Sequence, residues 1–135
     1  MFQEDLEQAH AVELAAIPVL EKHIPGSRAW PVPFYHYDFD LLWQWPDYPE
    51  AFGVECKFDR LALQTHRVAI EHRSIGKSTA LFALYRFSGA FWLLYIDDLR
   101  GMIGRYPETT GGDFNYQLTL VPERDFIRQA MYLKN

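Results

Sequence analysis

The segment 52–58, FGVECKF, places a carboxylate and an ammonium group two residues apart, at Glu55 and Lys57. Its alternation of apolar and polar residues predicts a β-strand, in which side chains two positions apart point to the same face. A carboxylate and an ammonium fixed on one face can hold a divalent cation and orient a nucleophilic water. On a solvated strand the same pair would be only a surface ion pair, so the neighbouring residues decide between these two interpretations.

A predicted hairpin brings an aspartate beside this pair. Residues 40–45 read as a strand, and the PDYP that follows reads as the turn leading back into the Glu-x-Lys strand. Antiparallel pairing about this turn sets Asp40 opposite Glu55 and Asp38 opposite Lys57. Directly opposite residues share a face, with Cβ atoms about 4.5–5.5 Å apart. The short turn leaves limited room for a register slip, so Asp40, Glu55 and Lys57 are expected to converge.

A third carboxylate comes from the first predicted helix, residues 3–23, whose apolar side chains recur at helical spacing. Glu13 falls on that apolar stripe. A buried ionised carboxylate is costly unless it is paired or bound to a metal. Packing of the helix on the sheet would bring Glu13 towards Asp40 and Glu55, whereas a kink or division at Pro18 would allow it to rotate to solvent.

This order of residues and elements resembles the PD-(D/E)xK nuclease superfamily, which includes many restriction endonucleases and archaeal Holliday junction resolvases. The resemblance covers roughly residues 5–97: a helix with a glutamate, a strand headed by an aspartate, a hairpin, and Glu-x-Lys. Residues 65–79, THRVAIEHRSIGKST, also look like the strand and glycine loop found in some small members. The resemblance implies an α/β fold with a restriction endonuclease-like αβββαβ core, in which helices flank a mixed central sheet.

The resemblance also implies an activity, namely Mg²⁺-dependent hydrolysis of DNA phosphodiester bonds by an endonuclease, with Mn²⁺ as a substitute ion. Asp40, Glu55 and the Cys56 backbone carbonyl would bind the ion through oxygen, and the ion would activate a water and neutralise phosphate charge. Lys57 would orient that water or steady the developing charge, and Glu13, the fourth catalytic residue, would support the site or bind a second ion. Many relatives of this size are homodimers, so a homodimer that nicks DNA or cuts branched DNA such as junctions is expected.

A literal Pro-Asp string occurs at Pro46-Asp47, but it is not the predicted ligand. Asp47 lies at the tip of the hairpin, about 23 Å from Glu55 along the strand. Asp40 heads its strand as the family's aspartate does, with Asp38 as the alternative. The rim that contacts DNA phosphates is expected to include Arg67, Arg73, Lys77, Ser78 and Thr79.

The remaining sequence predicts one α/β domain over residues 1–135. Two further strands, 67–72 and 91–97, follow the hairpin, and a helix over 79–89 is predicted between them. The proline-containing stretch 28–37 reads as an extended connection or an edge strand. Towards the C-terminus a short helix, a strand and a final helix are predicted over 99–106, 116–121 and 122–133.

Composition restricts the class of protein. Hydrophobic residues make up 49% and aromatic residues 16% of the chain, which argues against disorder. No apolar run reaches the roughly 18 residues that a membrane span needs. The single cysteine, Cys56, excludes an internal disulfide framework and a cysteine-based zinc site. Without a visible secretory signal, a cytoplasmic protein of bacterial or phage type is expected, with no membrane partner.

Charge leaves two functions open. The net charge of −5 divides into −8 over residues 1–59 and +3 over residues 60–135. A DNA partner is compatible with this asymmetry if the acids bind metal and the bases face the phosphates. The acidic first half and the bulky hairpin tip equally allow a catalytically inactive module that binds DNA or another protein. A P-loop is disfavoured because Glu71 stands where that motif needs its first glycine.

Overall fold

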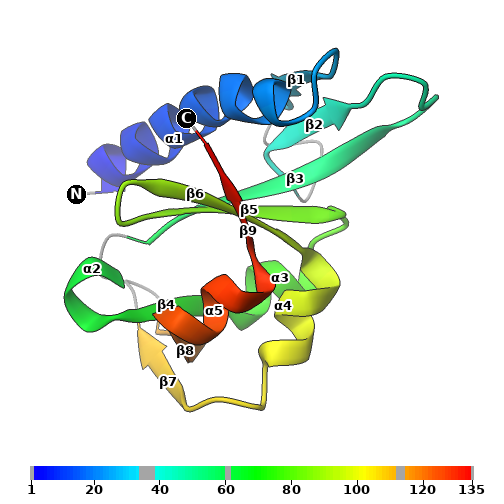
Figure 1. The fold of residues 1–135 in the computed structure, drawn as a ribbon. Coiled ribbons are helices and arrows are strands. Elements are labelled where there is room, and N and C mark those ends of the chain that lie inside the picture. Colours follow the sequence, from blue (N-terminus) through cyan, green and yellow to red (C-terminus); the bar gives the residue numbers. More distant parts are fainter. Residues whose placement is uncertain (1, 34–38, 60–61, 112–114, 135) are drawn as a thin grey trace.

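The structure, a computed structural model, describes residues 2–33, 39–59, 62–111 and 115–134. Within these residues a mixed sheet runs through the middle of the molecule (Figure 1). Its strands, in spatial order, are β1 (Arg28–Pro31), β2 (Leu41–Gln44), β3 (Ala51–Phe58), β5 (Phe82–Phe87), β6 (Ala90–Tyr95) and β9 (Met131–Leu133). β3 and β5 are parallel, and the other neighbours are antiparallel. The predicted α/β class with a mixed central sheet is confirmed.

The two faces of this sheet are covered by different layers (Figure 1). Helix α1 (Phe2–His23) lies across one face. The opposite side holds a smaller antiparallel sheet of β4 (Arg67–Glu71), β8 (Tyr116–Pro122) and β7 (Glu108–Gly111). Around it lie the helices α2 (Ala62–Thr65), α3 (His72–Lys77), α4 (Ile96–Met102) and α5 (Glu123–Gln129). Of the helices described, none is both long enough and apolar enough to cross a bilayer.

Each face of the central sheet has its own apolar core, and β5 contributes to both. Ala83, Tyr85 and Phe87 belong to the core shared with α4 and α5. Phe82 and Leu84 belong to the core shared with α1. Because successive side chains of a strand point to opposite faces, a strand covered on both sides is apolar throughout. This explains why every residue of the strand sequence FALYRF except Arg86 is apolar or aromatic.

The helix predicted over 79–89 is wrong, because residues 82–87 form β5. A short apolar run that is buried on both faces has no alternation, so periodicity cannot distinguish it from a buried helix. The strand predicted over 67–72 exists as β4, but it pairs with β8 and does not join the central sheet. The final predicted helix ends at Gln129, and residues 131–133 instead form β9 at the edge of the sheet.

A buried hydrogen bond fixes the start of the sheet under α1. The indole Nε1 of Trp43, a fully buried side chain on β2, donates to the Ser27 Oγ at 2.9 Å. Ser27 is itself buried and follows the turn that ends α1.

We expect Ser27→Ala to lower the free energy of unfolding by about 2 kcal/mol, because the indole N–H would stay buried and lose its acceptor. Urea denaturation measures this, with the exposed Ser88→Gly as the control; equal stability of the two variants would contradict it.

Candidate functional site

Asp40 is held against β3 by two hydrogen bonds. The paired register of β2 and β3 ends at Leu41 opposite Val54, so Asp40 lies one residue before the first pair. Its backbone N–H donates to the Val54 carbonyl at 3.0 Å. Its carboxylate Oδ2 accepts the backbone N–H of Cys56 at 2.7 Å. These contacts place the Asp40 carboxylate beside the Glu-x-Lys segment, as the register predicted from the sequence requires.

Glu55 and Lys57 lie on the same face of β3. The Lys57 Nζ is 3.5 Å from the Glu55 Oε1, and both side chains are largely buried, with exposed fractions of 23% and 12% respectively. The Lys57 Nζ also donates to the Ser74 Oγ at 2.7 Å, which joins β3 to helix α3. The interpretation as a solvated surface ion pair is therefore wrong, because both groups are shielded by neighbouring elements.

Helix α1 supplies Glu13 to the same cluster. α1 continues through Pro18 as one helix, so it is not divided there as the sequence had allowed. The Glu13 side chain is 22% exposed, and His10 lies 3.7 Å from it, one turn earlier. Glu13 and Asp40 form a side-chain hydrogen bond, which lowers the pKa of Asp40 and raises that of Glu13.

The three carboxyl groups have raised pKa values because they are buried close to one another. Burial is the main cause for each. Burial and the Asp40 charge together raise the pKa of Glu13 from 4.5 to about 7. Burial and the same charge raise the pKa of Glu55 from 4.5 to about 7, although Lys57 opposes the change. Burial raises the pKa of Asp40, against the effects of the Cys56 N–H and of Lys57. The cluster thus has more carboxylates than positive charge to balance them.

The donor chemistry of this cluster fits a divalent cation. Carboxylate and backbone carbonyl oxygens are the ligands that Mg²⁺ prefers, and a cation would supply the positive charge that the cluster lacks. No group of three or more histidine, cysteine, aspartate or glutamate side chains is arranged as a ready metal-binding set, as far as the described residues show. In this conformation the Glu13 and Asp40 side chains hydrogen-bond to each other, so an ion bound to Asp40 would compete with this hydrogen bond.

Other predicted residues are placed differently. Asp47 lies in the turn between β2 and β3 with a φ of 67°, as expected for a hairpin tip. Asp38 lies outside the described residues. Phe58, the last residue of β3, has an exposed fraction of 42%. Asp59 accepts the backbone N–H groups of Ala62 and Ala69, so it fastens the end of β3 to α2 and β4.

The predicted phosphate rim is only partly suited to that role. Arg73 and Lys77 are exposed on α3, and the Arg73 guanidinium stacks over the Tyr116 ring at 5.8 Å. Thr79 is exposed just after α3, and Arg67 is exposed at the far end of β4. Ser78 is buried, and its Oγ accepts the Ala80 N–H, so the prediction that it contacts phosphate is wrong.

Two residues near the cluster lie outside the predicted set of catalytic and metal-binding residues, although the sequence allowed Glu71 as a further acidic neighbour at the end of its strand. Glu71, at the end of β4, is close enough for its charge to raise the pKa of Glu55. Ser74 contacts Lys57 directly. Residue spacing could not place either of them. β4 and α3 are positioned by the smaller sheet, in which β4 pairs with β8, a strand far along the chain.

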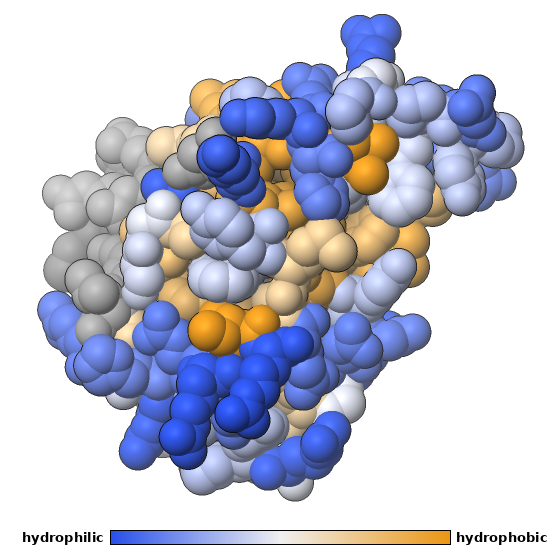
Figure 2. Space-filling model, in the orientation of Figure 1, coloured by the Kyte–Doolittle hydropathy of each residue, from blue (hydrophilic) through white to orange (hydrophobic). Residues whose placement is uncertain are grey.

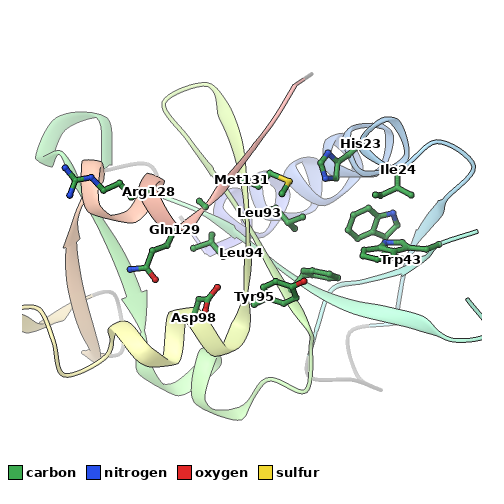
Figure 3. Close-up of a pocket in the computed structure, with 13 residues that line it drawn as sticks. His23, Ile24, Trp43, Leu93, Leu94, Tyr95, Asp98, Arg128, Gln129 and Met131 are labelled. Carbon is green, nitrogen blue, oxygen red and sulfur yellow. The ribbon is translucent and has the colours of Figure 1, made fainter.

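A separate groove of about 500 Å³ lies beside β6, between the end of α1 and the junction of α5 with β9 (Figure 3). Its lining includes Trp43, Leu93 and Tyr95, with His23 and Arg128 towards opposite ends (Figure 3). Apolar side chains gather across the middle of this face, between α1 and the lower elements (Figure 2). The groove shares no lining residue with the carboxylate cluster, so it is no part of that chemistry.

Comparison of the chain with protein-family models, with curated proteins and with solved structures gives no match. Its function is therefore argued from the cluster of Glu13, Asp40, Glu55 and Lys57, from the elements that hold these residues, and from the resemblance noted in the sequence.

Proposed function

We propose that this protein is a metal-dependent DNA endonuclease that hydrolyses phosphodiester bonds. The observation that carries the proposal is the convergence of Glu13, Asp40 and Glu55 with Lys57 in one largely buried cluster. Three carboxylates and one ammonium are costly to bury together. Binding of a cation and an anionic substrate would stabilise these buried charges, and a phosphodiester bound through Mg²⁺ supplies both.

Asp40, Glu55 and the Cys56 carbonyl would hold Mg²⁺, or Mn²⁺ in its place. When bound, such an ion lowers the pKa of a coordinated water and neutralises phosphate charge. The Lys57 ammonium is a compact donor of three hydrogen bonds, suited to orienting that water or stabilising charge on a phosphate oxygen. Glu13 would support the site or bind a second ion. Glu55 and Lys57 lie on the face of β3 that is turned towards α3, and Glu13 reaches Asp40 from α1 on the other face.

A restriction endonuclease-like core is proposed on these same elements. Support comes from an aspartate at the head of β2, Glu-x-Lys on the neighbouring β3, and a glutamate on the helix packed over them. The parallel strand beside β3 is β5, which lies where the sequence predicts a helix. The proposed core therefore rests on the placement of the four polar residues rather than on the predicted order of helices.

DNA is the proposed substrate, cut in a structure-selective way at junctions or by nicking, and the proposed assembly is a homodimer. The exposed Arg73 and Lys77 support a DNA partner, because α3 also carries Ser74 to the Lys57 side of the cluster. An inactive DNA-binding or protein-interaction module is the second candidate. The observation that favours it is the lack of a preformed three-ligand metal arrangement among the described residues.

Incubation with supercoiled plasmid and with a four-way junction, in Mg²⁺, Mn²⁺ or EDTA, tests the proposal. Cleavage is expected with either ion and none with EDTA. Lys57→Met should abolish it, whereas Lys134→Met, which replaces an exposed lysine outside the site, should not. A salt-dependent gel shift without cleavage in any ion would instead establish the binding module. Light scattering during gel filtration tests the homodimer.

Lys77→Ala should weaken DNA binding without changing the cluster. With Ca²⁺ replacing Mg²⁺ to prevent turnover, we expect the slope of log affinity against log salt to fall by about one, because one phosphate contact is lost. Fluorescence anisotropy over a salt series measures the slope, and Lys134→Ala is the matched control. Identical slopes for the two variants would remove Lys77 from the proposed rim.

A further inference from the structure

We propose that Ser74 is a positioning residue for Lys57, and that it keeps the ammonium away from Glu55 so that the glutamate stays available as a cation ligand. This inference rests on the proposed nuclease function for its kinetic consequence. Its structural part, the immobilisation of Lys57 by Ser74, stands on the contacts themselves.

The distances show which partner holds the ammonium. The Lys57 Nζ lies 2.7 Å from the Ser74 Oγ but 3.5 Å from the Glu55 Oε1. A direct charge-assisted hydrogen bond between ammonium and carboxylate is about 2.7–2.9 Å long. Lys57 is therefore directed at the serine hydroxyl, and its contact with Glu55 is loose. If the ammonium closed on Glu55, it would occupy the oxygens that a cation needs.

Ser74 can act in this way because helix α3 is fixed along its length. Before Ser74, the His72 Nε2 hydrogen-bonds to the buried Thr119 Oγ1 at 2.6 Å, across to β8. After it, Ile75 is fully buried in the core. The Arg100 guanidinium, from α4, donates to the Ile75 carbonyl at 3.3 Å and to the Ser78 carbonyl at 2.6 Å. The serine hydroxyl is therefore presented from a rigid support.

A flexible lysine needs such a support. Its side chain has four rotatable methylene groups, and fixing it costs conformational entropy. Glu55 belongs to the same strand and moves with Lys57, so it cannot by itself define the direction of the ammonium. Ser74 comes from a different element, and this gives the ammonium a fixed position relative to the Asp40 and Glu55 carboxylates.

The test combines a structural readout with a kinetic one. The mobility of the Lys57 ammonium is measured by ¹⁵N relaxation of the lysine NH₃⁺ signals in the full chain, with the Lys57 signal assigned by its loss in Lys57→Met. Cleavage of plasmid DNA in Mg²⁺ gives kcat and KM. The variants are Ser74→Ala, the hydroxyl-retaining Ser74→Thr, and the exposed Ser88→Gly as the control, since Ser88 has a positive φ that glycine accepts.

We expect Ser74→Ala to make the Lys57 ammonium as mobile as that of an exposed lysine, and to lower kcat about tenfold with little change in KM. Ser74→Thr should restore both values, and Ser88→Gly should change neither. A Lys57 ammonium that stays immobile in Ser74→Ala would overturn the inference, whatever the activity. Absence of cleavage by the wild-type protein would instead count against the proposed function, and the relaxation result would still decide the role of Ser74.

Discussion

Asp40→Asn should reduce metal-dependent DNA cleavage by roughly 10³-fold in kcat, which corresponds to about 4 kcal/mol of lost transition-state stabilisation. The amide keeps the shape of the side chain and can still accept the Cys56 N–H through its oxygen. What it loses is the negative charge that would hold the cation. Plasmid cleavage under saturating Mg²⁺ measures the effect.

The same substitution should not destabilise the metal-free protein. Asp40 adds negative charge that raises the pKa of both Glu13 and Glu55. Its neutralisation relieves this repulsion, so near pH 8 the free energy of unfolding in EDTA should be unchanged or higher by about 1 kcal/mol. Loss of activity with retained or increased stability is typical of a residue kept for function, at some cost to the fold.

Asp47→Asn is the matched control, because it makes the same chemical change at the hairpin tip, where the literal Pro-Asp string lies. Asparagine tolerates the positive φ of that position. We expect full activity from this variant. Loss of cleavage in Asp47→Asn with retention in Asp40→Asn would reverse the assignment of the aspartate.

The second large effect is on stability as a function of pH. The pKa of Glu13 and that of Glu55 are raised from 4.5 to about 7 in the folded protein. The folded state therefore binds protons more tightly than the unfolded chain, and stability is lost as the pH rises through this interval. Between pH 4.5 and about 7 the metal-free protein should lose about 3 kcal/mol, the equivalent of one such shift, since coupled groups do not add independently.

Urea denaturation in EDTA at several pH values measures this loss, and Glu13→Gln should make the profile flatter. Addition of Mg²⁺ or Ca²⁺ near pH 8 should restore stability, by about 2.7 kcal/mol at 100 times the dissociation constant, because the ion replaces the missing protons. If stability instead increased steadily over the same pH range, as it does for proteins with salt-bridged carboxylates, folding would not raise the pKa values of Glu13 and Glu55.

The local sequence predicted how the four polar residues come together. The two-residue period of a strand puts Glu55 and Lys57 on one face. The short turn between Trp45 and Ala51 limits the register, which brings Asp40 to Cys56 and its neighbours. The apolar stripe of α1 predicted that Glu13 would turn towards the sheet, and its hydrogen bond to Asp40 shows that it does. Each of these predictions depends on contacts between residues close in the chain or on the period of one element.

The tertiary structure alone decided the rest. The FALYRF segment is a strand because both of its faces are covered by elements far along the chain, and burial on both faces removes the alternation that marks a strand. Ser78 is buried, and Ser74 reaches Lys57, because α3 is anchored to β8 and α4. Spacing within a segment contains no information about such partners. The support of the lysine therefore depends on long-range packing, although the lysine itself is evident in the sequence.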